Sequence, residues 1–170
     1  MPVKPMVVTP DDARATDFDE FYRARFQSLT LQLYAYAGDL AEAQDLVQEA
    51  FCRAYVRWQK IRDYDDPAQW VRQVAWNLAT SRFRRRRTAA NFLRRQRLTV
   101  VDGPDPNRVA LVRALSTLPP KHRRAVVLHH MAQLSVAEIA AQEGVAEGTV
   151  KSWLSRGRAA LASQLRGDAS

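Results

Sequence analysis

The sequence predicts an all-α fold of two small helical domains joined by a flexible linker. Apolar residues recur at spacings of three and four without β-type alternation, and glycine is scarce. The helical pattern fails over residues 88–107, which end in the turn-forming run Asp-Gly-Pro-Asp-Pro and are typical of a linker. We therefore expect domains over residues 17–87 and 108–166, preceded by a disordered tail over residues 1–16.

Three helices are expected in the first domain. The first covers Asp17–Ala37 and is ended by Gly38, and the second covers about Leu40–Trp58. The third begins after Asp66, an N-cap residue, with proline at its first position, and covers Pro67–Arg87. The second helix has apolar residues at helical spacing: Leu46, Val47, Ala50, Phe51, Ala54, Tyr55 and Trp58.

The second domain is expected to end in a helix-turn-helix. Helices over 108–116 and 120–131 come first, and Ser135 with Glu138 then forms a capping box that opens a short helix. Gly144 ends that helix, and a longer one follows over 147–166. Small Ala140 at the helix crossing and apolar Val150 in the second helix suit the tight packing of this motif.

The exposed face of the last helix is the candidate DNA-reading surface. The N-terminal part of such a helix enters the major groove and reaches base edges and phosphates. A plain helical hairpin with a solvated basic face is the alternative, and Ala146 lacks the side-chain oxygen that normally caps a recognition helix. The candidate residues are Glu147, Thr149, Lys151, Ser152, Ser155, Arg156 and Arg158.

Charge is distributed unevenly along the chain. The net charge is +8, but residues 1–81 carry nine basic and twelve acidic residues, whereas residues 82–170 carry seventeen and six. A polyanionic partner is therefore expected for the second half. The second helix of the first half bears an acidic stripe, Asp39, Glu42, Asp45 and Glu49, with Gln48 beside it. This stripe is either an ordinary solvated face or a contact surface for a basic protein.

The third helix carries a different polar flank. Gln73, Asn77, Thr80 and Arg84 share one side, and Arg82 with Arg84–Arg87 forms a cationic end. Amides followed by arginines suit the bases and backbone of an opened DNA strand. Trp70 falls on the apolar arc, which favours core packing over base stacking. Trp76 falls on the other flank of the helix from these polar residues.

The order of these motifs resembles the sigma factors of bacterial RNA polymerase. Asp45-Leu46-Val47-Gln48-Glu49-Ala50-Phe51 is similar to their core-binding segment, and Trp70, Asn77 and Arg84-Arg85 to the helix that melts and reads the −10 element. Leu118-Pro119-Pro120, Glu138-Ile139-Ala140 and Gly148-Thr149-Val150-Lys151-Ser152 resemble the domain that reads the −35 element. Together they look like the extracytoplasmic-function (ECF) class, and Asp17-Phe18-Asp19-Glu20-Phe21 with Asp65-Asp66-Pro67 is similar to its actinobacterial SigE-type branch.

The resemblance implies regions 2 and 4 of a sigma factor, core RNA polymerase and promoter DNA as partners, an anti-sigma factor as a further candidate partner, a cytoplasmic location and no catalysis. It assigns Asp45, Gln48 and Glu49 to core-polymerase binding. It assigns the −10 element to Trp70, Gln73, Asn77, Thr80, Arg82, Arg84 and Arg85. Trp76 and Ser81 depart from the residues that many relatives have at these positions, arginine and aspartate.

Two other classes of protein fit the sequence less well. A stand-alone helix-turn-helix regulator would explain the last helices. It would not explain an acidic stripe beside a helix suited to binding an opened DNA strand. An enzyme is disfavoured because His129 and His130 are adjacent and point to different faces, so no metal spacing results. Cys52 is the single cysteine, so no disulfide forms within the chain, and we expect no cofactor and no membrane span.

Overall fold

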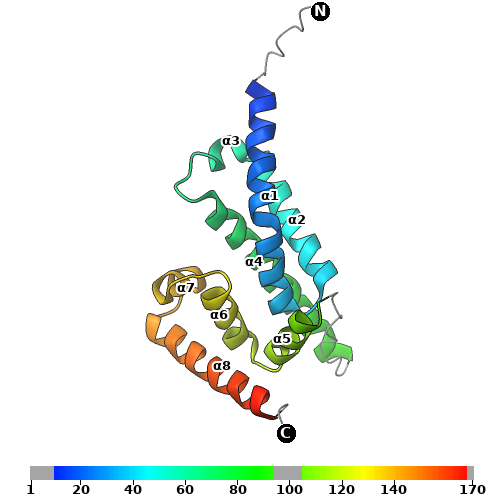
Figure 1. Cartoon of the computed structure of the whole chain (residues 1–170), viewed down its shortest axis with the longest axis vertical. Helices are drawn as coiled ribbons and strands as arrows, with labels where there is room; N and C mark the ends of the chain where they lie inside the picture. Colours follow the sequence, from blue (N-terminus) through cyan, green and yellow to red (C-terminus); the bar gives the residue numbers. More distant parts are fainter. Residues whose placement is uncertain (1–9, 94–104, 168–170) are drawn as a thin grey trace, which may run out of the picture.

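The computed structural model describes residues 10–93 and 105–167 and consists, over those ranges, of eight helices (Figure 1). The first four form the N-terminal half and the last four the C-terminal half. The helices are α1 (Pro10–Ala37), α2 (Leu40–Val56), α3 (Trp58–Ile61), α4 (Pro67–Leu93), α5 (Pro106–Ser116), α6 (Pro120–His130), α7 (Val136–Glu143) and α8 (Glu147–Gly167). The all-α prediction is confirmed.

An aromatic cluster holds α1 against α2 and α3. The ring centroids of Phe21 and Trp58 are 5.0 Å apart in a stacked arrangement, and Phe18 meets Phe51 edge to face at 6.3 Å. Phe51 and Trp58 are almost fully buried, so these rings contribute area burial as well as ring–ring attraction. Tyr55, which we expected to be buried, is 58% exposed although its ring lies 5.1 Å from that of Phe18.

Several helix ends differ from the sequence-based prediction. The first helix begins at Pro10, so residues 10–16 of the predicted tail are helical, and residues 1–9 lie outside the described residues. The sequence contains the signal for this start: a proline followed by two aspartates is a favourable helix N-terminus. The helix predicted to reach Trp58 instead breaks at Arg57, whose φ and ψ are −109° and 15°.

The ends of the predicted linker are also helical. The fourth helix runs to Leu93 rather than Arg87, and α5 begins at Pro106, with the Asp105 carboxylate accepting a hydrogen bond from the Asn107 amide at 3.0 Å. Residues 94–104 of the linker lie outside the described residues. Asp66 accepts a hydrogen bond from the Gln69 amide at 3.2 Å, as expected for the start of α4.

The C-terminal half contains the predicted helix-turn-helix. Ser135 and Glu138 form the capping box of α7, and Gly144 takes a left-handed conformation with φ of 66° to end it. Val150 and Leu154 of α8 are buried. The crossing of α8 over α6 depends on Gly157, where an added Cβ would lie 2.7 Å from Val126 Cγ2.

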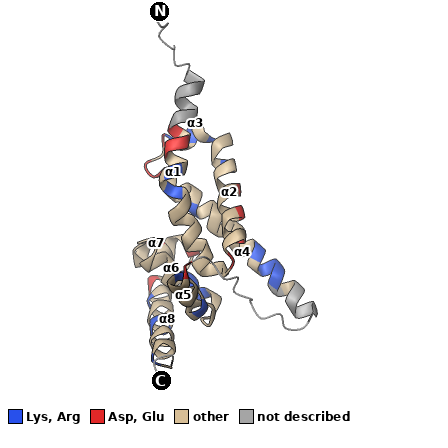
Figure 2. Cartoon of the chain, turned by 45° about the vertical axis from the view of Figure 1, so that its right-hand side comes forward, with Lys and Arg blue, Asp and Glu red and all other residues tan. Residues whose placement is uncertain are grey.

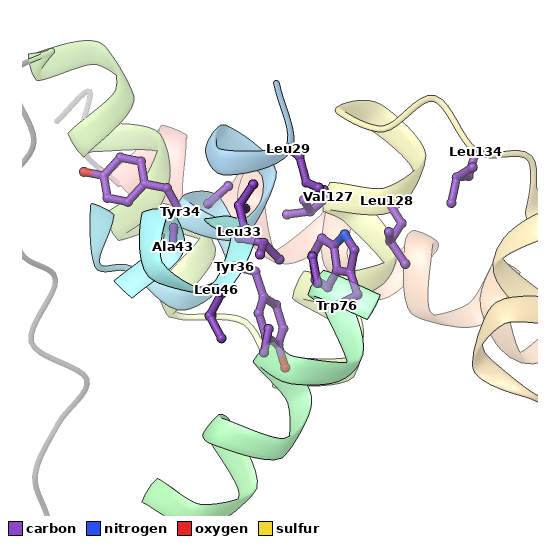
Figure 3. Close-up of a cluster of buried hydrophobic side chains, with 14 of the residues drawn as sticks. Leu29, Leu33, Tyr34, Tyr36, Ala43, Leu46, Trp76, Val127, Leu128 and Leu134 are labelled. Atoms are coloured by element: carbon purple, nitrogen blue, oxygen red, sulfur yellow. The ribbon is translucent and has the colours of Figure 1, made fainter. Parts of the chain in front are cut away.

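The two halves share one hydrophobic core. Buried residues of α1, α2 and α4 belong to the same cluster as those of α5–α8, and Figure 3 shows Trp76 of the N-terminal half beside Val127 and Leu128 of the C-terminal half. Trp76 is fully buried, with its ring 5.1 Å from that of Tyr36. Within the described ranges, the longer helices are all too polar to cross a membrane.

Candidate functional site

The polar face of α2 is narrower than the sequence suggested. Asp45 and Gln48 are exposed, and Glu49 is half exposed in an ion pair of 2.7 Å with Arg53. Glu42, in contrast, is 8% exposed and pairs with Arg86 of α4 at 2.6 Å.

Asp39 likewise makes a contact within the fold and is not available as part of an acidic contact surface. Its carboxylate caps α2 by accepting a hydrogen bond from the Glu42 amide at 3.2 Å. The predicted stripe of four carboxylates is therefore wrong. Glu42 and Asp39 make contacts within the fold, and Asp45, Gln48 and Glu49 remain as the solvent-facing polar residues of this stripe.

The polar flank of α4 is mostly free. Gln73, Asn77 and Arg84 are exposed along one side of the helix, and Arg85 is exposed next to half-buried Arg82. Figure 2 shows the basic residues gathered toward the end of α4. Trp70 is half-buried and packs against the core. Trp76, which the sequence placed on the other flank of the helix from Gln73 and Asn77, is fully enclosed.

Within this flank, Thr80 forms side-chain hydrogen bonds to other parts of the chain. Its hydroxyl donates a hydrogen bond to the Trp76 carbonyl at 2.9 Å and accepts one from the Arg124 guanidinium of α6. Arg124 belongs to the C-terminal half, so this contact joins the halves. In this conformation the Thr80 hydroxyl has no hydrogen left to donate to DNA.

The candidate recognition surface of α8 is open. Lys151, Ser155 and Arg156 are exposed on one side, and Glu147 and Arg158 are exposed as well. Thr149 and Ser152 are half-buried in the first two turns of α8. A cationic and hydroxyl-rich helix N-terminus suits phosphate contacts and base-edge contacts in a major groove.

Two arginines of α6 were missed by the sequence analysis. Arg123 and Arg124 are 3% and 8% exposed, although arginine is almost never buried unless it is paired. Arg123 donates hydrogen bonds to the carbonyls of Tyr36 at 2.7 Å and Leu118 at 3.1 Å, and burial lowers its pKa. The sequence signal was their neighbourhood, since both precede the buried run 125–128.

The histidines do not assemble into a metal site. The Nδ1–H of His129 donates a hydrogen bond to the Leu134 carbonyl at 2.8 Å, and the His129 ring lies 4.9 Å from that of His130. Burial lowers the pKa of His130, and His129 and Arg158 add to that effect. Among the described residues, histidine, cysteine, aspartate and glutamate do not cluster in groups able to hold a metal ion.

These helices define a protein of the sigma-70 family. Residues 22–89 match the family model for sigma-70 region 2, and residues 108–161 match that for sigma-70 region 4. The chain therefore belongs to the sigma factors of bacterial RNA polymerase, and its sequence relatives place it in the ECF class.

Two relatives illustrate the match. The RNA polymerase sigma-E factor of Streptomyces coelicolor is 34% identical over 152 residues, covering 88% of this chain and 86% of its own. The ECF sigma factor SigW of Bacillus subtilis is 31% identical over 173 residues, and the match covers 92% of this chain and 91% of SigW. The fold is similar to that of the sigma factor RpoE from Bartonella quintana, whose structure was solved in complex with the anti-sigma factor NepR. The TM-score is 0.77 at 24% sequence identity, and the match covers 89% of this chain and 98% of that chain.

Proposed function

We propose that this sigma factor docks on core RNA polymerase through α2 and directs initiation by holding opened −10 DNA on α4 and duplex −35 DNA on α8. The observation that carries the proposal is the segregation of charge. The exposed Asp45 and the half-exposed Glu49 of α2 lie on the surface of a chain whose second half is strongly basic, and the negative charge of DNA disfavours contact of nucleic acid with that face.

The residue assignments follow the exposed surfaces. Core polymerase binds Asp45, Gln48 and Glu49. Opened −10 DNA binds the exposed flank of α4, and the partly buried Trp70, Thr80 and Arg82 border it. The −35 duplex binds the start and outer side of α8. The functional domains are region 2 over 17–87 and region 4 over 108–166, joined by the linker 88–107.

This function needs no catalytic group, because synthesis of RNA belongs to the polymerase. A protein that acts on bacterial RNA polymerase works in the cytoplasm. The RpoE of known structure is bound to an anti-sigma factor, and we propose a protein of that class as a regulator of this chain as well.

Run-off transcription tests the proposal directly. Purified chain is added to core polymerase on genomic fragments, and transcript ends are mapped. We expect discrete start sites that depend on the chain, preceded by a common pair of sequence elements. A stand-alone regulator would instead bind duplex DNA tightly without polymerase and would leave core polymerase without specific starts.

A further inference from the structure

We propose that the ion pair of Glu42 in α2 with Arg86 in α4 positions the strand-holding flank of α4, and that Arg86 is a positioning residue and not a DNA contact. The pair joins the helix that docks on polymerase to the helix that holds opened DNA. Its existence rests on contacts within the N-terminal half, and its role in holding DNA rests on the proposed function.

The arginines at the end of α4 lie on different sides of the helix. Arg84 shares a side with Gln73 and Asn77, because residues at spacings of seven and eleven return to nearly the same angle. Arg86 lies two residues beyond Arg84, which turns it about 200° away at about 100° per residue. A strand held along the side of Arg84 therefore leaves Arg86 on the opposite side of the helix.

The side of α4 that carries Arg86 packs against other helices of the N-terminal half. Ala79, two turns before Arg86, is 3% exposed, and the centroid of the Phe83 ring lies 6.0 Å from that of Tyr36 at the end of α1. Glu42 of α2 lines the same small crevice as Phe83 and Arg86. This packing brings Arg86 to the first turn of α2.

Glu42 is the buried member of the ion pair. Its side chain is 8% exposed and its Oε2 lies 2.6 Å from Arg86 Nη1, whereas the Arg86 side chain is 54% exposed. Among the residues that the structure describes, Arg86 is the cation that pairs with this carboxylate. A carboxylate buried without a counter-charge is costly. Transfer of Arg86 to a DNA phosphate would therefore cost free energy that the release of an arginine from an exposed pair does not.

The position of Glu42 is fixed by the start of α2. Its backbone amide donates a hydrogen bond of 3.2 Å to the N-cap residue Asp39, and negative charge in the first turn suits the helix dipole. Asp45 and Glu49 of the docking face lie on the same side of α2, about one and two turns further along. The ion pair therefore sets where the opened strand on α4 lies relative to the polymerase that binds α2.

Binding of an opened strand by the complex with polymerase tests the positioning role. The chain and its variants are bound to core polymerase, and the affinity for a single-stranded −10 oligonucleotide is measured at several salt concentrations. Glu42→Gln and Arg86→Gln each break the ion pair, and Arg84→Gln removes a cation from the opposite side of α4. Arg108→Gln is the matched control, because that side chain is 51% exposed and pairs with Asp105, which is itself 43% exposed.

We expect the variants to differ in salt dependence. Arg84→Gln should reduce the magnitude of the slope of log K against log salt by about 0.7, the value for one phosphate of a single strand. Glu42→Gln and Arg86→Gln should each lower the affinity several-fold at every salt concentration without changing the slope, since neither removes a phosphate contact. The double variant should bind about as well as either single variant, and Arg108→Gln should bind like the parent chain.

Three results would overturn the positioning role. A slope for Arg86→Gln as shallow as that for Arg84→Gln would show that Arg86 contacts DNA. Tighter binding by Glu42→Gln would show that Glu42 withholds Arg86 from the strand. Parent-like affinity of both variants would show that the pair positions nothing. Glu42→Gln carries the test if Arg86→Gln does not fold, because it removes the buried charge itself.

Thermal unfolding of the free chain tests the ion pair itself, without polymerase or DNA. Arg86→Gln should lower the Tm by several degrees and Arg108→Gln hardly at all, and the effects of Glu42→Gln and Arg86→Gln should be non-additive. Equal Tm values for the parent chain and both variants would overturn the pair. Failure of the parent chain to hold the strand in a complex with polymerase would contradict the proposed function, and the Tm values would still decide whether the pair exists.

Discussion

Arg124 of α6 lies over the indole ring of Trp76 in α4, with 5.1 Å between the guanidinium carbon and the ring centroid. The two residues are 48 positions apart and belong to different regions of the sigma factor. Both side chains are buried, so we expect their contact to couple the stabilities of the two regions.

A double-mutant cycle should detect this coupling. We expect Trp76→Leu and Arg124→Leu to interact by about 1 kcal/mol in the free energy of unfolding, measured by urea denaturation and circular dichroism. The same cycle with Arg108→Leu in place of Arg124→Leu should be additive within about 0.5 kcal/mol. Additivity of the first cycle would contradict a direct contact.

Charge reversal on α2 should abolish docking on polymerase. In Asp45→Lys/Glu49→Lys the exposed carboxylates become cations, which a basic partner surface repels. The double variant should lose core polymerase in a pull-down while its helical content stays unchanged. Asp63→Lys/Asp65→Lys makes the same charge change in the exposed loop before α4 and should retain binding. Undiminished capture of polymerase by the α2 variant would refute the docking assignment.

Removal of two cations from α8 should weaken promoter use. Lys151→Ala/Arg156→Ala should reduce promoter-specific transcription. The slope of log K against log salt for DNA binding should fall by up to about 1.8, or about 0.9 for each phosphate that the variant no longer neutralises. The variant Arg108→Ala/Arg166→Ala removes two exposed arginines of region 4 outside the proposed DNA surface. If both pairs lower the slope equally, the recognition surface has been assigned wrongly.

Two glycines of α8 should respond oppositely to alanine. Gly157→Ala places a Cβ 2.7 Å from Val126 Cγ2, and valine in a helix has one favoured rotamer, so we expect about 1–3 kcal/mol of destabilisation. Gly148→Ala meets nothing within 4 Å and should gain up to about 1 kcal/mol from helix propensity. Thermal unfolding of the two variants measures the difference, and a stabilised Gly157→Ala would show that α6 and α8 do not cross at this residue.

Alkaline pH should weaken the fold around Tyr36. Burial raises the pKa of the Tyr36 phenol above its usual value of 10.0, although Arg124 and Arg123 oppose the shift. The phenol loses its proton more readily in the unfolded chain, so this stabilisation is complete below pH 10 and declines as the pH rises beyond it. Unfolding free energies between pH 8 and 11 should fall less steeply for Tyr36→Phe than for the parent chain. Parallel slopes would contradict a buried phenol.

Much of the fold was predictable because its signals are local. The capping box of Ser135 and Glu138, the left-handed Gly144 and the start of α4 at Pro67 each depend on residues within one turn of each other, and all were confirmed. The start of α1 at Pro10 was equally local and was overlooked.

The candidate surfaces were only partly predictable. A helical wheel assigns Glu42 and Asp45 to the same outer arc, but only the structure brings Arg86 of α4 to Glu42 and leaves Asp45 exposed. Periodicity identifies one helix at a time, so it cannot indicate which of its polar positions a second helix will cover.

The order of the amino acids was enough to establish that this chain is helical, which segments carry negative or positive charge, and which motifs mark a sigma factor. Those properties follow from residue type and short-range spacing. Tertiary structure alone decided that Arg124 would meet Trp76 and Thr80, since the contact joins side chains more than 40 residues apart. The free energy of burying a guanidinium depends on partners that the folded chain supplies.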